Sequence, residues 1–159
     1  MKTLILAAVV AFMPLGAFSQ DFQAGADAYE RGDYETALRE WRPLAEQGYA
    51  PAQNNLALMY YHGQGVTQDY AEAVRWYRKA AEQGDALAQS NLSTMYYLGE
   101  SLTQDYVTAH MWANIAAAGG NDTAAANRDI VASQMTAEAI AEAQRRARVC
   151  MESGYQDCD

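Results

Sequence analysis

The sequence predicts an all-α fold, an α/α solenoid of antiparallel helix pairs that a C-terminal capping helix closes. Three observations predict it: an internal repeat, a helical spacing of apolar residues within each copy, and an amphipathic final segment outside the repeat. Residues 33–68 and residues 69–104 agree at 20 of 36 positions, and a third, decayed copy covers residues 105–134. A period of this length is typical of stacked helical pairs that bury their apolar faces against their neighbours.

The first 19 residues have the pattern of a secretory signal peptide. Lys2 gives a positive start, and an apolar run over residues 4–13 is too short to span a bilayer. Residues 17–19, Ala-Phe-Ser, form a small-x-small cleavage site. An amphipathic N-terminal helix is the alternative, but the apolar run has no polar face. We therefore expect cleavage near Ser19 and Gln20 and a periplasmic or secreted product of a bacterial cell.

The charge balance limits the possible partners. Without the leader the chain has 10 basic and 20 acidic residues. Nucleic acids and anionic lipid surfaces are bound by concentrated lysine and arginine, so we expect neither as a partner. No later segment is apolar enough for a membrane span, and the acidic balance suits a partner with a basic segment.

Each full copy predicts two antiparallel helices. In residues 51–62 the apolar side chains recur at helical spacing, and Gly63 ends the helix. Asp69 is a good N-cap for a second helix over residues 70–83, which ends at Gly84. The same pattern predicts further helices at residues 22–31, 34–47, 87–98 and 106–118, with a kink at Pro43.

The chain changes after the third copy. Residues 121–132 are polar, and Arg128 stands where the earlier copies have leucine, so this helix has lost part of its stacking face. A final helix over residues 136–152 has one narrow apolar stripe and charged residues elsewhere. Such a helix is expected to cap the exposed end of the stack, so we divide the chain into a leader at residues 1–19, an array at residues 20–134 and a cap at residues 135–159.

One motif runs through both full copies, A-x-x-N-L-x-x-M-Y-x-x-G followed by Q-D-Y-x-x-A. The first copy carries it in Ala52, Asn55, Leu56, Met59, Tyr60, Gly63, Asp69, Tyr70 and Ala73, and the second in Ala88, Asn91, Leu92, Met95, Tyr96, Gly99, Asp105, Tyr106 and Ala109. The motif resembles the Sel1-like repeat family, a relative of the tetratricopeptide repeats. The resemblance implies a right-handed superhelix that acts as a binding scaffold. Ala57 and Ser93 depart from the family, which usually has glycine there.

The only two cysteines stand close together at the C-terminal end. Cys150 and Cys158 have Gly154 between them to turn the chain, and in an oxidising compartment such a pair predicts a disulfide. Two unpaired thiols are the alternative. No further cysteine or histidine is spaced to complete a metal site, so we expect no metal and no cofactor.

Catalytic patterns are nearly absent. His62 and His110 lie in different predicted helices, and neither has a serine or cysteine nucleophile at a suggestive spacing. The acidic residues recur because the repeats recur. We therefore expect a protein that is not an enzyme.

A groove is the candidate binding surface. In related tetratricopeptide arrays the first helix of each pair lines the concave side, and the residues beside its core stripe face outward. The predicted groove residues are Asn54, Leu58, Tyr61, His62, Ser90, Thr94, Tyr97 and Leu98, with Asp27 and Glu30 as an acidic extension that favours a basic ligand segment. Exposed tyrosines suit an extended peptide. Alternatively, Tyr61 and Tyr97 pack sideways against the helix that follows.

Three functions stay open at the level of the sequence. The first is a non-catalytic exported scaffold that binds a protein or peptide in the groove. The second is a structural protein that associates with itself or with the cell wall. The third is a penicillin-binding or hydrolase activity, as in cysteine-rich relatives of the family, although this chain has no cysteine within its repeats.

Overall fold

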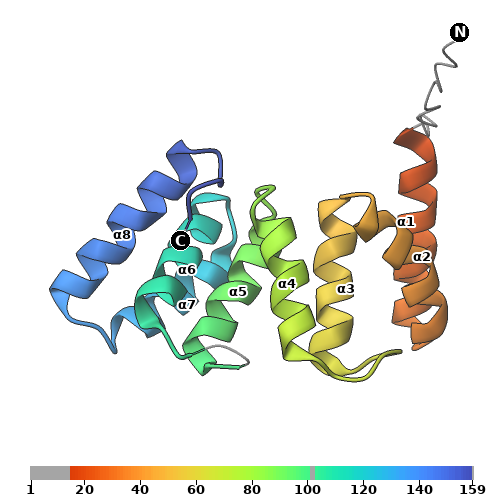
Figure 1. Ribbon diagram of the computed structural model, residues 1–159, viewed down its shortest axis with the longest axis horizontal. Helices are drawn as coiled ribbons and strands as arrows, with labels where there is room; N and C mark the ends of the chain where they lie inside the picture. Colours follow the sequence, from red (N-terminus) through yellow and green to blue (C-terminus); the bar gives the residue numbers. More distant parts are fainter. Residues whose placement is uncertain (1–14, 101–102, 159) are drawn as a thin grey trace, which may run out of the picture.

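The computed structural model describes residues 15–100 and 103–158, with side chains described from residue 21 onward. This part of the chain contains eight α-helices and no strand. The helices are α1 (Leu15–Glu30), α2 (Tyr34–Glu46), α3 (Ala50–His62), α4 (Tyr70–Ala81), α5 (Ala86–Leu98), α6 (Tyr106–Ala118), α7 (Asp122–Ala132) and α8 (Ala137–Glu152). They follow one another from α1 at one end of the long axis to α8 at the other (Figure 1).

The helices pack as consecutive antiparallel pairs. From α1 to α7 each helix contacts the next, while α5 also contacts α7 and α6 contacts α8. The odd-numbered helices therefore form one layer and the even-numbered helices the other. The predicted all-α solenoid of stacked helix pairs is confirmed.

The repeat period is visible in the helix ends. Asp33, Asp69 and Asp105 are the N-caps of α2, α4 and α6, and the side chain of each accepts a hydrogen bond from a backbone N–H of the first turn. Gly63 and Gly99 end α3 and α5 in the left-handed conformation, with φ of 68° and 72°. Glycine adopts this conformation without the steric cost of a Cβ, so the chain turns at the same point in both copies.

Small residues bring the two layers close together. Ala73, Ala80 and Ala81 of α4 are completely buried, and the large ring of Tyr77 on the same helix is 2% exposed. Alanine lets helices approach closely, while the aromatic ring fills the space that remains. The core of the array is therefore built from the repeat positions themselves.

Buried glutamines join successive repeats. Gln53 Nε2 donates to the carbonyl of Ala45 at the end of α2, and Gln89 Nε2 donates to the carbonyl of Ala81 at the end of α4, both at 3.1 Å. Each carbonyl also accepts a backbone N–H of the following turn, from Gly48 or Gly84, so the glutamine occupies its second acceptor position. These glutamines were not singled out in the sequence, although they recur 36 residues apart.

One prediction near the N-terminus needs correction. Helix α1 begins at Leu15, not at residue 22, so neither Ser19 nor Asp21, both suitable N-cap residues, marks its start. The helix thus runs across the predicted cleavage site, while residues 1–14 of the predicted leader lie outside the described residues. Helix α2 contains Pro43 within its length, as the predicted range of residues 34–47 does, and the kink at Pro43 stays a prediction.

The capping helix packs on one layer only. Helix α8 contacts α6 and buries Ala143, Ala147 and Cys150. A disulfide joins Cys150 to Cys158, with 4.5 Å between their Cα atoms. We call residues 150–158 the tail clasp, because this segment closes a covalent ring at the end of the chain.

Tyr155 fixes the tail clasp to an earlier repeat. It is the one non-glycine residue of the described part with positive φ, at 66°, and its N–H donates to the carbonyl of Cys150 at 2.8 Å. Its ring lies against Gly84, where an added Cβ would come within 3.0 Å of the ring. The tail therefore reaches from α8 to the turn between α4 and α5.

Candidate functional site

Two hollows open on the surface of the odd-numbered layer. The first, the α3–α5 hollow, has a volume of about 150 Å³. It is lined by Leu58, Tyr61, His62, Tyr77, Asn91, Thr94 and Met95. Its floor is the buried ring of Tyr77 and its rim is made of polar and aromatic side chains, so its character is mixed.

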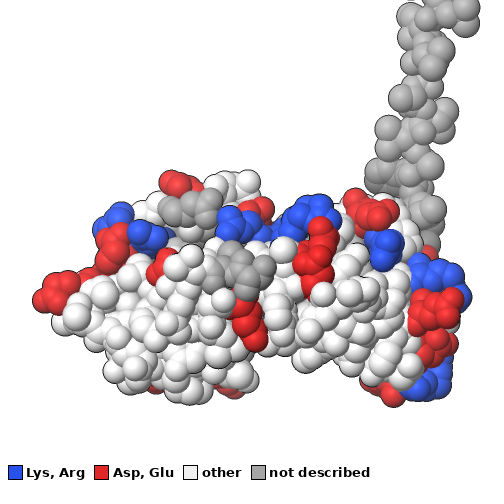
Figure 2. Space-filling view, turned by 60° about the horizontal axis from the view of Figure 1, so that its bottom comes forward, with Lys and Arg blue, Asp and Glu red and all other residues white. Residues whose placement is uncertain are grey.

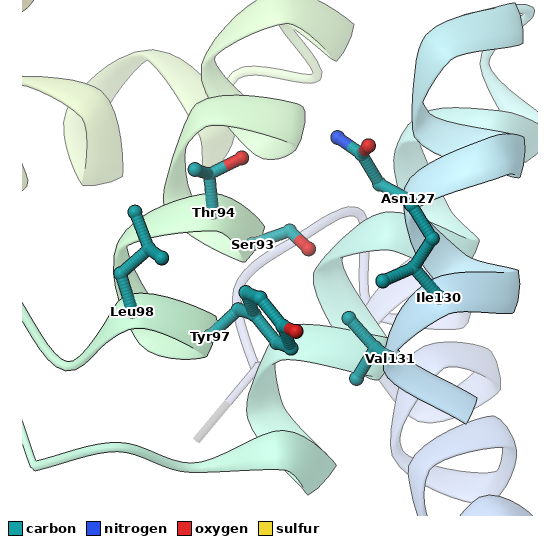
Figure 3. A pocket seen from close by; sticks show the side chains of 7 residues that line it. All are labelled: Ser93, Thr94, Tyr97, Leu98, Asn127, Ile130 and Val131. Atoms are coloured by element: carbon teal, nitrogen blue, oxygen red, sulfur yellow. The ribbon is translucent and has the colours of Figure 1, made fainter. Parts of the chain in front are cut away.

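The second, the α5–α7 hollow, has a volume of about 210 Å³. It is lined by Ser93, Thr94, Tyr97, Leu98, Asn127, Ile130 and Val131 (Figure 3). Val131 is 2% exposed, whereas Leu98 and Ile130 are 50% and 54% exposed. Large apolar side chains with that much exposure at one hollow are typical of an interaction surface.

Thr94 belongs to both hollows, so they are adjacent. We call the surface that carries the two hollows, together with the side of α1 in the same register, the groove face. Six of the predicted groove residues line it: Leu58, Tyr61, His62, Thr94, Tyr97 and Leu98.

Asn54 and Ser90 were placed wrongly in the groove. Asn54 is 6% exposed and Ser90 is 8% exposed, and neither lines a hollow. Asn91 Nδ2 donates to Asn54 Oδ1 at 3.1 Å, which joins α5 to α3. The prediction gave each helix a single buried face, but a helix inside a stack also packs against the next helix of its own layer.

Tyr61 and Tyr97 are half-buried, and each packs against the first residue of the helix that follows. Their rings lie 5.3 Å from the ring of Tyr70 and 5.7 Å from the ring of Tyr106. Burial raises the pKa of Tyr61 to about 12, with a hydrogen bond to Glu100 and the charge of that carboxylate as further causes. Each tyrosine thus lines a hollow and supports a helix at once.

Asp27 and Glu30 lie on α1 in the register of the groove face. Counted back from the left-handed glycine that follows each helix, Asp27 stands where Leu58 and Thr94 stand, and Glu30 stands where Tyr61 and Tyr97 stand. Both carboxylates are exposed. Asp27 accepts one hydrogen bond, from Gln23 Nε2 at 2.7 Å, which leaves it further acceptor capacity.

Three residues of α7 were missed by the sequence analysis: Asn127, Ile130 and Val131. Arg128 stands where the earlier copies have leucine, and it indicates a helix that has lost part of its stacking face. The signal was present, because Ile130 lies one repeat period after Thr94 and thus continues the same stripe. The groove face extends from α1 to α7.

Charged side chains are unevenly spread over the surface. Figure 2 shows them gathered along one edge and over the α1–α2 end of the face that it presents, while much of the remaining surface carries neither sign. The residues that line the two hollows include no lysine, arginine, aspartate or glutamate. The surface of the two hollows is therefore made of apolar and neutral polar side chains, with His62 as the one titratable base among them.

The two histidines do not form a site together. His62 is exposed at the end of α3, whereas His110 is 2% exposed within α6. Burial lowers the pKa of His110, and the nearby charge of Arg128 adds to this effect. No group of metal-ligating side chains occurs among the described residues, and no helix of that part is long and apolar enough to cross a membrane.

Comparison with known proteins supports the same architecture. Residues 50–85 and residues 86–121 each match the model of the Sel1 repeat. The solved structure of a Sel1 repeat protein from Oxalobacter formigenes is 34% identical, with a TM-score of 0.63, over 72% of this chain and 89% of that chain. The chain belongs to the Sel1 repeat family. Each matched Sel1 repeat begins with an odd-numbered helix, α3 or α5, and ends after the even-numbered helix that follows.

A second solved structure covers more of the Sel1 array. It is a protective antigen present in uropathogenic Escherichia coli strains that displays an SLR fold, and it is 30% identical with a TM-score of 0.79. The similarity covers 87% of this chain but only 31% of that protein, so the chain spans about a third of its length. No curated protein matches the chain.

Proposed function

We propose that this Sel1 repeat protein is an exported, non-catalytic scaffold that binds an extended segment of another protein along its groove face. The observation that carries the proposal is the pair of adjacent hollows that share Thr94. Two adjacent hollows without lysine, arginine, aspartate or glutamate, one of them with the exposed side chains of Leu98 and Ile130 at its rim, suit a chain laid across several helices. A compact active site would instead need converging reactive groups.

The proposal extends to compartment and domain organisation. The leader at residues 1–19 directs export, residues 20–134 form the array, and residues 135–159 form its cap. The disulfide between Cys150 and Cys158 supports this reading, because disulfides persist in oxidising compartments such as the periplasm. N-terminal sequencing of the protein recovered from a periplasmic extract tests it, with Gln20 as the expected first residue.

A blocked groove tests the binding function. In Thr94→Arg a long charged side chain enters the place where both hollows meet. Leu87→Arg is the matched control, because Leu87 is on the same helix, is 61% exposed and lines neither hollow. Envelope extracts are crosslinked to wild type and to both variants, and the partners are quantified by mass spectrometry.

We expect wild type and Leu87→Arg to recover the same partners and Thr94→Arg to lose them, with similar melting temperatures for all three. Equal recovery by Thr94→Arg would show that the groove face is not the binding surface. Recovery of the chain itself as the main crosslinked product would instead support the self-associating structural protein.

A further inference from the structure

The groove face changes in chemistry along its length. One position of the groove face lies five residues before the left-handed glycine that follows each odd-numbered helix. We call the row of these positions the stripe, and it holds Asp27 on α1, Leu58 on α3 and Thr94 on α5. The next position of the stripe, one period after Thr94, is Ile130 on α7. The stripe is thus acidic at one end and apolar at the other.

The acidic end presents free carboxylates. Asp27 and Glu30 are exposed and form no ion pair among the described residues. The adjacent Arg31 acts on Asp33, whose pKa is lowered first by hydrogen bonds from Thr36 and less by the charge of Arg31. Two exposed carboxylates one helical turn apart attract a basic side chain over this end of the groove face.

The apolar end suits one side chain. The α5–α7 hollow, at about 210 Å³, is smaller than the roughly 300–1,000 Å³ of sites that enclose a whole small molecule. Ile130 and Leu98 stand at its rim with half of their surface exposed, and Val131 forms its floor. An aliphatic or aromatic side chain that enters it buries these surfaces.

The distance between the two ends sets a spacing. The start of α3 lies beside α1, because the ring centroid of Tyr49, the N-cap of α3, is 5.4 Å from that of Phe22 on α1. Helix α5 lies beside α3. Packed helices lie about 8–10 Å apart, so the way from α1 to the hollow beyond α5 is about 20–25 Å. An extended chain covers this in about six to eight residues at about 3.3 Å each.

We propose that the groove face binds an extended peptide that carries a basic residue over Asp27 and Glu30 and an apolar residue, about seven positions away, in the α5–α7 hollow. This inference rests on the proposed peptide-binding function and gives its ligand a chemistry and a register. The occupant is a peptide of opposite charge to α1, not a second copy, because a second copy of this acidic chain repels that end.

Synthetic peptides test the register. Fluorescein-labelled peptides of glycine and serine carry two lysines and one tryptophan, separated by about three, seven or eleven residues in either chain order, and their affinity for the purified protein is measured by fluorescence anisotropy. We expect the tightest binding at a separation of about seven. Equal affinity at all three separations would overturn the proposal.

Paired variants test the two ends separately. Asp27→Asn combined with Glu30→Gln is compared with Glu46→Gln combined with Glu82→Gln, which changes the net charge equally at exposed positions outside both hollows. We expect about a fivefold loss of affinity for the first pair, which is reduced at high salt, and little change for the second. Equal effects of the two pairs would overturn the proposal that Asp27 and Glu30 bind the basic residue of the peptide.

Ile130→Ser is compared with Leu87→Ser in the same way, because both leave an exposed serine on the odd-numbered layer. We expect about a tenfold loss for Ile130→Ser alone. If peptide binding is lost in Thr94→Arg but is insensitive to Asp27, Glu30 and Ile130, the register is wrong and the proposed function stands. If no peptide binds wild type, and the protein forms oligomers that Ile130→Ser dissolves, both proposals fail.

Discussion

The two full repeats are nearly identical in sequence, yet their polar atoms are satisfied to different degrees. In the first, Gln64 accepts a hydrogen bond from the Tyr29 hydroxyl at 2.7 Å and donates one to the Tyr34 hydroxyl at 3.0 Å. In the second, the same position is Glu100, which has a hydrogen bond with Tyr61, but its Oε2 is buried with no hydrogen-bond partner among the described residues. An amide that both donates and accepts has become a carboxylate that only accepts.

A second position shows the same difference. Ala57 of the first repeat corresponds to Ser93 of the second, and both are almost completely buried. The Ser93 hydroxyl has no partner among the described residues, and Ser93 lines the α5–α7 hollow. At these two positions the first repeat has no unpaired buried polar atom, while the second has two such atoms next to the candidate site. Such local conflicts are expected where a fold serves a function.

The largest expected effect comes from truncation of a core leucine in each of the two repeats. Leu56 and Leu92 occupy the same position and are 1% and 0% exposed. Truncation of either to alanine is expected to cost about 2–5 kcal/mol in the free energy of unfolding. Urea denaturation of the two variants measures this. Similar losses would confine the difference between the repeats to their polar atoms, whereas a much smaller loss at Leu92 would mean that the second core is looser as well.

The tyrosine clamp around Gln64 gives the next effect. Gln64→Ala removes two hydrogen bonds and leaves the hydroxyls of Tyr29 and Tyr34 to find other partners. We expect a loss of about 1–2 kcal/mol in the same measurement. Thr67→Ala, which changes an exposed residue of the same loop, serves as the control. An equal loss in both variants would mean that the clamp around Gln64 contributes nothing specific.

Glu100→Gln should make the second repeat resemble the first. The amide can donate where the carboxylate cannot, so we expect a gain of about 1 kcal/mol at neutral pH. The reverse change, Gln64→Glu, is expected to destabilise by a similar amount. Loss of stability in Glu100→Gln would show that the charge itself is needed at this junction.

Ser93→Ala and Ala57→Ser exchange the residues of the two repeats at the second position that differs. Removal of the unpaired hydroxyl from the second repeat is expected to stabilise by about 0.5–1 kcal/mol, and its introduction into the first to destabilise by about 1 kcal/mol. Thermal unfolding resolves changes of this size. A stabilising Ala57→Ser would mean that the two environments differ in more than the hydroxyl.

The smallest expected effect concerns how the free energy of unfolding depends on pH in the alkaline range. The pKa of Tyr61 is raised to about 12 by burial and then by Glu100, so the folded state holds the phenol proton more tightly than the unfolded chain. This contribution to stability is complete below pH about 10 and is lost as the pH rises toward 12. Denaturation at a series of alkaline pH values should show a shallower loss in Glu100→Gln and in Tyr61→Phe. An unchanged profile in both variants would mean that Tyr61 does not titrate in this range.

Much of the fold could be predicted because each repeat contains residues that mark where its helices begin and end. The N-cap aspartates and the left-handed glycines set the ends of α3 to α6 to within two residues of prediction. The early start of α1 was not predicted, because the cleavage-site pattern at residues 17–19 and the possible N-cap Asp21 both indicate a boundary that the helix runs through. Helix α2 was predicted to within one residue although it contains Pro43, and the kink expected at that residue stays a prediction.

The site was predicted less completely, for a reason of geometry. Helical periodicity finds the face of a helix that packs within one hairpin, and the residues beside this face follow from it. Tyr61, Thr94 and Tyr97 are such residues, and each lines a hollow. It does not report contacts between repeats, which bury Asn54 and Ser90. Nor does it show how far a stripe continues, although the period alone points to Ile130.

The tail clasp gives the end of the array a chemistry that none of the repeats has. Its ring closes only when Cys150 and Cys158 lose their thiol protons and electrons to an oxidant, and Cys150 is completely buried. In a reducing cytoplasm Tyr155 has no covalent link that holds it on Gly84. Without an oxidant the C-terminal segment therefore keeps only its non-covalent contacts, and formation of the disulfide adds a covalent closure to them.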